Sequence, residues 1–302
     1  MTNNTYHTPV LFEEALQAME IAEDSLLVDV TYGGGGHSRE ILSRLGDHGA
    51  LLAFDQDDDA LDNVIEDERF YFANANFRFL INFARYFDFM EADAILADLG
   101  VSSHQFDEGE RGFSIREEGL LDMRMNQRAD LTAFQVVNKY SEKDLYRIFN
   151  AYADLKNVPK VVRAITGARK TAKIETTADL VDLLRELVKG KKQNQFLAQV
   201  FQAIRIEVND EMGALMDLLE QSVKVLKPGG RLVVISYHSI EDRLVKNFFR
   251  SGNVEGKVEK DFYGVVQNPL KAVTRKPIVP NAEEVESNPR ARSAKMRVAV
   301  KV

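Results

Sequence analysis

Cysteine is absent from the sequence, which excludes disulfides, zinc–thiolate sites, iron–sulfur clusters and a cysteine nucleophile. Long apolar runs are absent as well. The longest uncharged stretch is residues 193–204, which is rich in glutamine and shorter than the roughly 20 apolar residues of a membrane span. No lysine or arginine precedes Arg39, so no secretory or transit peptide is expected. These absences predict a soluble protein of a reducing compartment, the cytoplasm, without a membrane partner.

Positive charge is scarce in the first third of the chain. Residues 1–100 carry 5 basic and 20 acidic side chains, whereas the whole chain has 39 basic and 47 acidic ones. The first hundred residues therefore have a balance of −15, and the remaining 202 residues, with 34 basic and 27 acidic side chains, a balance of +7. Although the net charge is −8, a polyanion could dock on the later, more basic part.

Short apolar runs alternate with helical patterns in the first hundred residues. The runs are residues 26–30, 51–54 and 94–97, and helical spacing occurs at 10–20 and 38–45. Such alternation is typical of parallel strands joined by right-handed crossovers. The next run, at 231–236, follows 133 residues after Asp98, where one crossover needs roughly 30–40. We therefore predict a doubly wound α/β domain formed by 1–110 and 209–302, interrupted by an inserted all-helical domain at 111–208.

Proline is concentrated near the end of the chain, which has four of its seven prolines at 269, 277, 280 and 289. This spacing predicts an extended, non-helical segment. Alternating apolar residues at 296, 298, 300 and 302 then predict a final strand.

A glycine-rich turn follows the first predicted strand and comprises Gly33, Gly34, Gly35 and Gly36, with His37 next. Glycines at a strand-to-helix turn let the backbone approach a ligand, and the helix start offers free N–H groups. Ser38 replaces the third glycine of a dinucleotide fingerprint, so NAD fits incompletely and S-adenosylmethionine is the alternative. A flexible surface loop is the remaining interpretation.

Polar residues follow the other predicted strands. Asp55 ends the second strand, 22 residues after Gly33, where a carboxylate can accept both ribose hydroxyls. Asp98 ends the third strand, and Tyr237 with His238 follows the fourth. Strand carboxyl ends meet at one edge of a parallel sheet, so these residues should share one crevice. Each also has an ordinary interpretation, as an exposed acid, a turn-capping aspartate or a hydrogen-bonded histidine.

Basic clusters are candidates for phosphate binding. Two lie in the inserted segment, at 156–173 and 189–192, and one lies near the C-terminus, at 290–297. The candidate RNA contacts are Arg163, Arg169, Lys170, Arg290 and Arg292. A solvated helix face is the alternative for each cluster.

Several longer motifs together resemble one family. They are HTPVL at 7–11, GGGGHS at 33–38, DLGVSS at 98–103, RGFS at 111–114, LDMRM at 121–125, FQAIRIEVN at 201–209, YHSIEDR at 237–243 and NPRARS at 288–293. In this order they resemble the MraW/RsmH family, bacterial methyltransferases that modify cytosine N4 in 16S ribosomal RNA.

The resemblance implies a Rossmann-like class I S-adenosylmethionine-dependent methyltransferase sheet and a cytosine target in the decoding centre of the small ribosomal subunit. It also gives an expectation of a homodimer. By motif position it implies cofactor contacts at Gly35, Gly36, His37, Asp55, Phe77, Asp98 and Gln105. The sequence departs from many amino-methyltransferases, because Asp98-Leu99-Gly100-Val101 stands where they carry an Asp/Asn/Ser-Pro-Pro-aromatic motif.

The catalytic residues expected on this basis are Asp98, Ser102 and Ser103 as acceptors for the target amine, with Tyr237 and His238 stacking on and orienting the base. No metal is expected. Three alternatives stay open: a non-catalytic RNA-binding assembly factor, an NAD-dependent oxidoreductase, and a methyltransferase acting on a protein or small-molecule amine.

Overall fold

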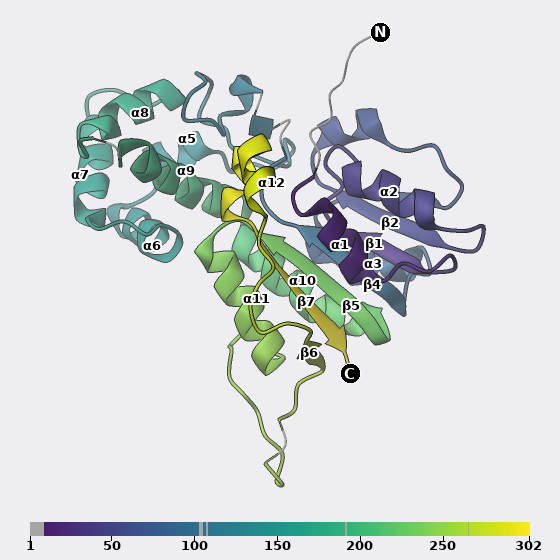
Figure 1. Ribbon diagram of the computed structural model, residues 1–302. Coiled ribbons are helices and arrows are strands. Elements are labelled where there is room, and N and C mark those ends of the chain that lie inside the picture. Colours follow the sequence, from purple (N-terminus) through teal and green to yellow (C-terminus); the bar gives the residue numbers. More distant parts are fainter. Residues whose placement is uncertain (1–8, 103–104, 107, 191, 265) are drawn as a thin grey trace. The chain divides into compact units, whose positions relative to one another are not determined.

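The computed structural model describes residues 9–302 apart from 103, 104, 107, 191 and 265 (Figure 1). The chain divides into two compact units. Residues 1–100 and 212–302 form the sheet unit, and residues 101–211 form the helical unit. The domain boundaries predicted from the sequence are 110/111 and 208/209. They refer to domains that fold independently, whereas the two units are defined by compactness alone, so these boundaries stay a prediction.

A seven-stranded sheet forms the centre of the sheet unit, in the order β3-β2-β1-β4-β5-β7-β6. Strands β1 to β5 pair in parallel, and β7 runs antiparallel to β5 and β6. The strands are β1 Leu26–Asp29, β2 Ala50–Asp55, β3 Phe70–Asn74, β4 Ala92–Asp98, β5 Leu226–Ser236, β6 Leu270–Ala272 and β7 Lys295–Lys301. The strand order reverses between β1 and β4, which is where open α/β sheets bind ligands. The predicted fold class, a Rossmann-like, doubly wound α/β sheet, is confirmed.

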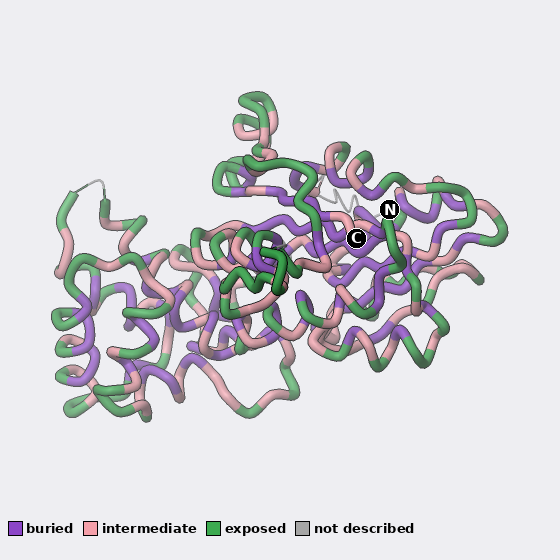
Figure 2. The backbone as a smooth tube through the Cα atoms, turned by 90° about the horizontal axis from the view of Figure 1, so that it is seen from below, coloured by how far each residue is buried: buried purple, intermediate pink, exposed green. Residues whose placement is uncertain are grey.

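Helices flank this sheet along the chain. They are α1 Phe12–Met19, α2 Gly36–Arg44, α3 Leu80–Tyr86, α10 Glu211–Val225, α11 Ser239–Ser251 and α12 Ala282–Ser287, with 3-10 helices at Asp58–Asn63, Phe77–Phe79 and Pro289–Ser293. The central strands are apolar on both faces: Leu27, Leu52, Leu96 and Val233 are all fully buried (Figure 2). Burial on both faces is why these strands appear in the sequence as unbroken apolar runs.

The proline-rich tail differs from the sequence prediction. Helix α12 lies between Pro280 and Pro289, so the prediction of a wholly extended segment was wrong there. Asn281 starts this helix by accepting the backbone N–H of Glu284 at 2.8 Å. Pro289 opens a 3-10 helix at its first position, where a missing N–H costs nothing.

Five α-helices lie in the described part of the helical unit: α5 Ala133–Lys139, α6 Glu142–Tyr152, α7 Val158–Ala168, α8 Thr177–Arg185 and α9 Gln193–Asn209. Helices α6 and α8 begin after N-caps with the motifs Ser-x-x-Asp and Thr-x-x-Asp, in which Ser141 and Thr176 accept the backbone N–H groups of Asp144 and Asp179. A separate apolar core, including Val136, Phe149 and Ile204, holds the helices together. Among the described residues, none of the helices has both the length and the apolar character needed to cross a bilayer.

Candidate active site

The glycine turn joins β1 to α2 at the carboxyl edge of the sheet. Gly35 is the N-cap of α2, with a φ of 76°, a conformation that side chains disfavour. A Cβ at Gly35 would lie 2.7 Å from the Tyr32 hydroxyl oxygen, and one at Gly36 would lie 2.6 Å from Pro9 Cγ. Both positions therefore require glycine, and they leave a backbone cradle at a helix start.

Asp55, at the end of β2, connects this strand to the glycine turn. Its two carboxylate oxygens accept the backbone N–H groups of Gly33 at 2.8 Å and Asp57 at 2.9 Å. Burial raises the pKa of Asp55 to about 6. A carboxylate can accept about four hydrogen bonds. Acceptor capacity thus remains for a ligand's hydroxyl groups.

Asp98 and Tyr237 meet across the ends of β4 and β5. The Tyr237 hydroxyl donates to Asp98 Oδ1 at 2.8 Å, and the Asp98 backbone N–H donates to Thr31 Oγ1 at 2.7 Å. Burial raises the pKa of Asp98 to about 7, repulsion from Asp29 and Glu241 adds to this, and the Tyr237 hydrogen bond opposes it. Burial, together with the Asp98 charge, raises the pKa of Tyr237 far above its usual value. Tyr237 therefore stays a donor, and Asp98 is poised to exchange a proton near neutral pH.

Glu241, one turn into α11, organises the residues after β5 and was missed in the sequence analysis. Its Oε2 accepts the backbone N–H groups of Tyr237 at 3.0 Å and His238 at 3.3 Å, and its own N–H donates to His238 Nδ1 at 3.4 Å. His238 Nε2 lies 3.1 Å from Glu241 Oε1. His238 is thus the N-cap of α11, and the His-x-x-Glu spacing of a capping box was the available signal.

Two further residues under the glycine turn were also missed. Asp29 accepts the Ser38 hydroxyl at 2.7 Å and the Thr31 backbone N–H at 3.1 Å, and burial raises its pKa. The Thr31 hydroxyl in turn accepts the Asp98 N–H. This buried chain of hydrogen bonds fixes the turn relative to the end of β4.

His37 has the features of a ligand contact. Its ring packs against Phe12 at a centroid distance of 5.5 Å, and its buried Nε2 has no hydrogen-bond partner among the described residues. Burial lowers the pKa of His37 to about 4, so the ring is neutral at pH 7. An orphaned polar atom beside a glycine cradle fits a site that a ligand completes.

The other predicted site residues are placed as follows. Phe77 opens a 3-10 helix capped by Asn76, whose side chain also donates to Gln56, the residue after Asp55, at 2.9 Å. Ser102 and Gln105 belong to the helical unit, where each side chain accepts the other's backbone N–H. Ser103, like residues 7 and 8 of the first motif, lies outside the described residues.

The predicted RNA contacts have different local roles. Arg169 is half-buried, and its guanidinium donates to the Val137 and Tyr140 carbonyl oxygens at 2.8 and 2.7 Å, so it caps the end of α5. Arg163 and Lys170 are exposed in the helical unit, and Arg290 and Arg292 are exposed in the sheet unit. Their RNA contacts stay predictions.

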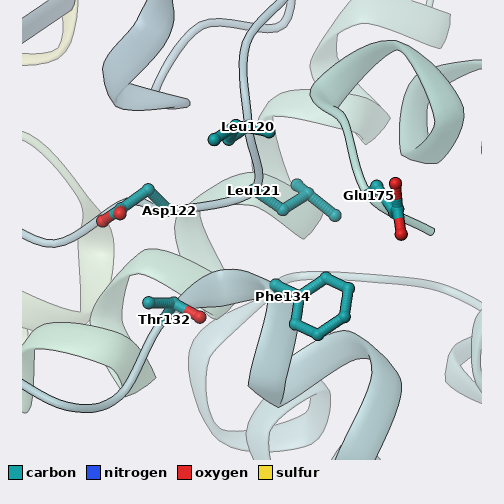
Figure 3. Close-up of a pocket in the computed structure, with 6 residues that line it drawn as sticks. All are labelled: Leu120, Leu121, Asp122, Thr132, Phe134 and Glu175. Carbon is teal, nitrogen blue, oxygen red and sulfur yellow. The ribbon is translucent and has the colours of Figure 1, made fainter. Parts of the chain in front are cut away.

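A pocket of about 260 Å³ lies in the helical unit (Figure 3). It is lined by Leu120, Leu121, Asp122, Thr132, Phe134 and Glu175. Arg124 binds both carboxylate oxygens of Asp122, at 2.8 and 2.7 Å, and opposes the effect of burial so that the pKa of Asp122 is lowered. That carboxylate is therefore held as a structural anion.

The strand ends of the sheet unit combine a glycine cradle, the Asp55 carboxylate with acceptor capacity to spare, and the Asp98 carboxyl group with a pKa of about 7. Together with the strand order, they define an α/β enzyme that binds an adenosine-containing cofactor at the carboxyl edge of its sheet.

Comparison with known proteins identifies the family. Residues 4–302 match the model of the MraW methylase family. The chain is 56% identical over 297 residues to a ribosomal RNA small subunit methyltransferase H of Bacteroides fragilis, with 98% of each chain covered. It is 55% identical over 301 residues to the protein of that name from Parabacteroides distasonis, with 99% of each covered. A solved Streptococcus mutans methyltransferase in complex with SAH aligns over 98% of this chain and 100% of its own, at 10% identity and a TM-score of 0.44.

The chain belongs to the MraW methylase family. It is a methyltransferase, and S-adenosylmethionine is its cofactor, as predicted. The residues present fit that cofactor: the cradle at Gly35 and Gly36, the acceptor at Asp55 and the unpartnered nitrogen of His37.

Proposed function

We propose that this enzyme methylates the exocyclic N4 amine of a cytosine in the decoding centre of 16S ribosomal RNA, within the small ribosomal subunit in the cytoplasm. The names of relatives 55–56% identical over nearly their whole length support the ribosomal RNA substrate. The motif resemblance supports the target atom. The observation that carries the chemistry is the Tyr237–Asp98 pair beside the glycine turn, because it places a proton acceptor at the carboxyl edge of the sheet.

The cofactor is assigned to one set of residues. Gly33, Gly34, Gly35, Gly36 and His37 would hold its methionine portion, and Asp55 would accept its ribose hydroxyls. Phe77 and Gln105 are assigned as further cofactor contacts. When bound, S-adenosylmethionine supplies a methyl group on a positively charged sulfur. The residues of this chain would orient that group toward the amine and exclude water.

Asp98 is assigned the central catalytic role. A cytosine amine is a poor nucleophile, because its lone pair is delocalised into the ring. A hydrogen bond from the amine to the Asp98 carboxylate would localise charge on the nitrogen while it takes the methyl group. The amine proton passes to Asp98, whose pKa of about 7 suits both its acceptance and its later release to water. Ser102 and Ser103 are assigned as further acceptors.

Tyr237 and His238 are assigned to orient the base. The Tyr237 hydroxyl donates to Asp98 and so fixes the carboxylate, while its ring offers a face for stacking. Glu241 holds the backbone of both residues. A stacked or paired target cytosine must first be flipped out, and the exposed Arg163, Lys170, Arg290 and Arg292 are assigned to the RNA backbone.

Methyl transfer to isolated small ribosomal subunits that lack the modification tests this proposal. After incubation with S-adenosylmethionine, the RNA is digested to nucleosides and analysed by mass. N4-methylcytidine should appear with the wild-type enzyme and form much more slowly with Asp98→Asn. Methylation at another atom, or no methylation by an enzyme that binds the cofactor in a titration, would contradict the assigned substrate.

A further inference from the structure

Residues 252–264 and 266–268, between α11 and β6, form an extension that we call the arm. It projects from the end of α11 in Figure 1. At its tip, Phe262 is 97% exposed and Tyr263 is 88% exposed. Large aromatic side chains rarely stand so far out of a protein surface singly, and two neighbours doing so point to an interaction site.

The two rings are arranged edge to face, with centroids 5.6 Å apart and an interplanar angle of 87°. Each ring uses only an edge or part of one face in this contact. Aromatic faces therefore remain open to a flat partner.

The root of the arm is held in place by close packing and by side-chain hydrogen bonds. Gly252 has a φ of 77°, and a Cβ there would lie 2.6 Å from Pro269 Cδ, so the two legs of the arm touch where it leaves the body. The Asn268 side chain donates to the Phe249 carbonyl at 2.9 Å, and the Asn253 side chain donates to the Lys257 carbonyl at 2.7 Å.

The tip is organised too. Lys260 and Val266 form an antiparallel bridge, and Asp261 accepts the Tyr263 N–H at 2.9 Å. These hydrogen bonds present the aromatic pair outward instead of letting it collapse onto the body, where burial would be favourable.

The exposed face of α11 carries only positive charge. Arg243, Lys246 and Arg250 recur at helical spacing and are all exposed. The two acids of this helix do not face the same way, because Glu241 is buried and Asp242 is paired with Arg297 at 2.7 Å. Arg243 and Lys246 have no ion-pair partner within the described part of the chain.

This basic face connects the candidate active site to the arm. Helix α11 follows its N-cap, His238, which is next to Tyr237, and it ends at Ser251, where the arm begins. Its three cations span about 10 Å of the helix axis. The arm carries both signs of charge: Lys257 and Lys260 are positive, and Glu255, Glu259 and Asp261 are negative. It therefore has no excess of positive charge for phosphates, and its tip would bind RNA by base stacking.

We infer that the basic face of α11 and the aromatic tip of the arm bind a single-stranded segment of the ribosomal RNA substrate, next to the nucleotide that is methylated. The cations hold phosphates along the helix, and a base stacks on Phe262 or Tyr263. Single-stranded RNA is recognised through this combination of a cationic track and aromatic faces. The inference rests on the proposed RNA substrate and adds where the strand runs.

The first test measures binding of a fluorescently labelled 12-nucleotide single-stranded RNA to the full-length enzyme. Phe262→Ala/Tyr263→Ala should weaken binding by about tenfold or more, and Phe262→Leu/Tyr263→Leu should weaken it similarly, because leucine keeps apolar surface but cannot stack. Arg243→Ala/Lys246→Ala/Arg250→Ala should lower the slope of log affinity against log salt by about 2. Tyr86→Ala removes an aromatic side chain that is 77% exposed elsewhere on the sheet unit and should change nothing.

The chain has no tryptophan, which gives a direct probe. Phe262→Trp introduces a single indole at the tip, and its fluorescence should be quenched when the 12-mer binds. Quenching that is absent while the RNA binds would overturn the stacking. If the leucine variant kept its RNA affinity, stacking would not be needed, and the exposed aromatic pair would instead be a binding site for an apolar protein surface. Failure of the wild type to bind the 12-mer would also overturn the inference.

Methylation kinetics separate this inference from the proposed function. With small subunits as substrate, the alanine double variant should raise KM about tenfold and leave kcat and S-adenosylmethionine affinity unchanged. An unchanged KM would overturn the role of the arm and leave the proposed reaction intact. Absence of methylation by the wild type would count against the proposed reaction, and the 12-mer assay would still decide the arm.

Discussion

The aspartates at the ends of β1, β2 and β4 differ in their partners from two acids of the helical unit, Asp122 and Glu211. At the carboxyl edge of the sheet, burial raises the pKa values of Asp29, Asp55 and Asp98, and no lysine or arginine side chain lowers any of them. In the helical unit, arginines hold the acids: Arg124 pairs with Asp122. Arg205 likewise pairs with Glu211 at 2.8 Å, with both side chains nearly buried. The first arrangement costs stability and suits proton exchange, whereas the second stabilises the fold.

Replacing Asp98 by asparagine should give the largest effect, on rate. The amide keeps an acceptor for the Tyr237 hydroxyl but cannot take the amine proton, so kcat should fall by about 10²–10⁴. Single-turnover methyl transfer measures this directly. In the wild type, the rate should also fall as the pH drops below about 7, because Asp98 becomes protonated.

A titration with S-adenosylmethionine is the control for that variant. Cofactor affinity should be close to that of the wild type. If the affinity for S-adenosylmethionine fell strongly while the maximal rate was unchanged, Asp98 would be a cofactor-binding residue. The raised pKa values at the carboxyl edge would then not indicate a role in proton transfer.

Removing Arg205 tests the opposite arrangement in the helical unit. Arg205→Ala leaves the Glu211 carboxylate nearly buried without its guanidinium, so the free energy of unfolding should fall by about 3–5 kcal/mol. Denaturant unfolding measures the loss. A matched control is Arg185→Ala, which removes an exposed ion pair with Asp182 and should cost less than about 1 kcal/mol. Equal losses of unfolding free energy in the two variants would show that the Arg205–Glu211 pair stabilises the fold no more than an exposed ion pair does.

The Asp98→Asn variant should also be more stable than the wild type at alkaline pH. The pKa of Asp98 is raised in the folded state, so its contribution to stability is complete below pH 4 and is lost as the pH rises through about 7. At pH 8 the folded wild type holds a buried carboxylate charge that asparagine lacks, and the variant should gain on the order of 3 kcal/mol. Melting curves at pH 8 and pH 4.5 should show a rise in Tm at the higher pH alone. A variant less stable at both would mean that Asp98 supports the fold.

The sequence predicted the parts of the molecule that are governed by local patterns. Strands β1, β2, β4 and β5 are buried on both faces and therefore appear as apolar runs. Strand β3, at the sheet edge with half-exposed positions, gave no such signal. Helix α12 was missed because prolines flank it without entering it.

Long-range side-chain contacts could not be predicted in this way. The sequence placed Asp98 and Tyr237 near one edge, but the 2.8 Å bond between them joins residues 139 positions apart. Arg169 bonds carbonyl groups 29 and 32 residues earlier, and nothing in a basic run distinguishes such a residue from its exposed neighbours. Sequence patterns therefore pointed to the carboxyl edge of the sheet as the candidate site, whereas the contacts of single charged side chains needed the folded structure.

Arg169 offers the finest comparison, because its neighbour Lys170 belongs to the same basic run. Arg169→Ala removes two hydrogen bonds from a charged donor to the end of α5, so the free energy of unfolding should fall by about 1–3 kcal/mol. Lys170→Ala, at an exposed position, should change the free energy of unfolding by less than about 0.5 kcal/mol.

RNA binding separates the two residues as well. If both residues bound RNA phosphates, each substitution would lower the slope of log RNA affinity against log salt concentration by about 0.7. We expect that change for Lys170→Ala alone, since the Arg169 guanidinium is already engaged by carbonyl groups. The opposite result would be that Arg169→Ala weakens RNA binding without destabilising the fold. Arg169 would then be an RNA contact, and its half-buried position in the helical unit would not indicate a structural role.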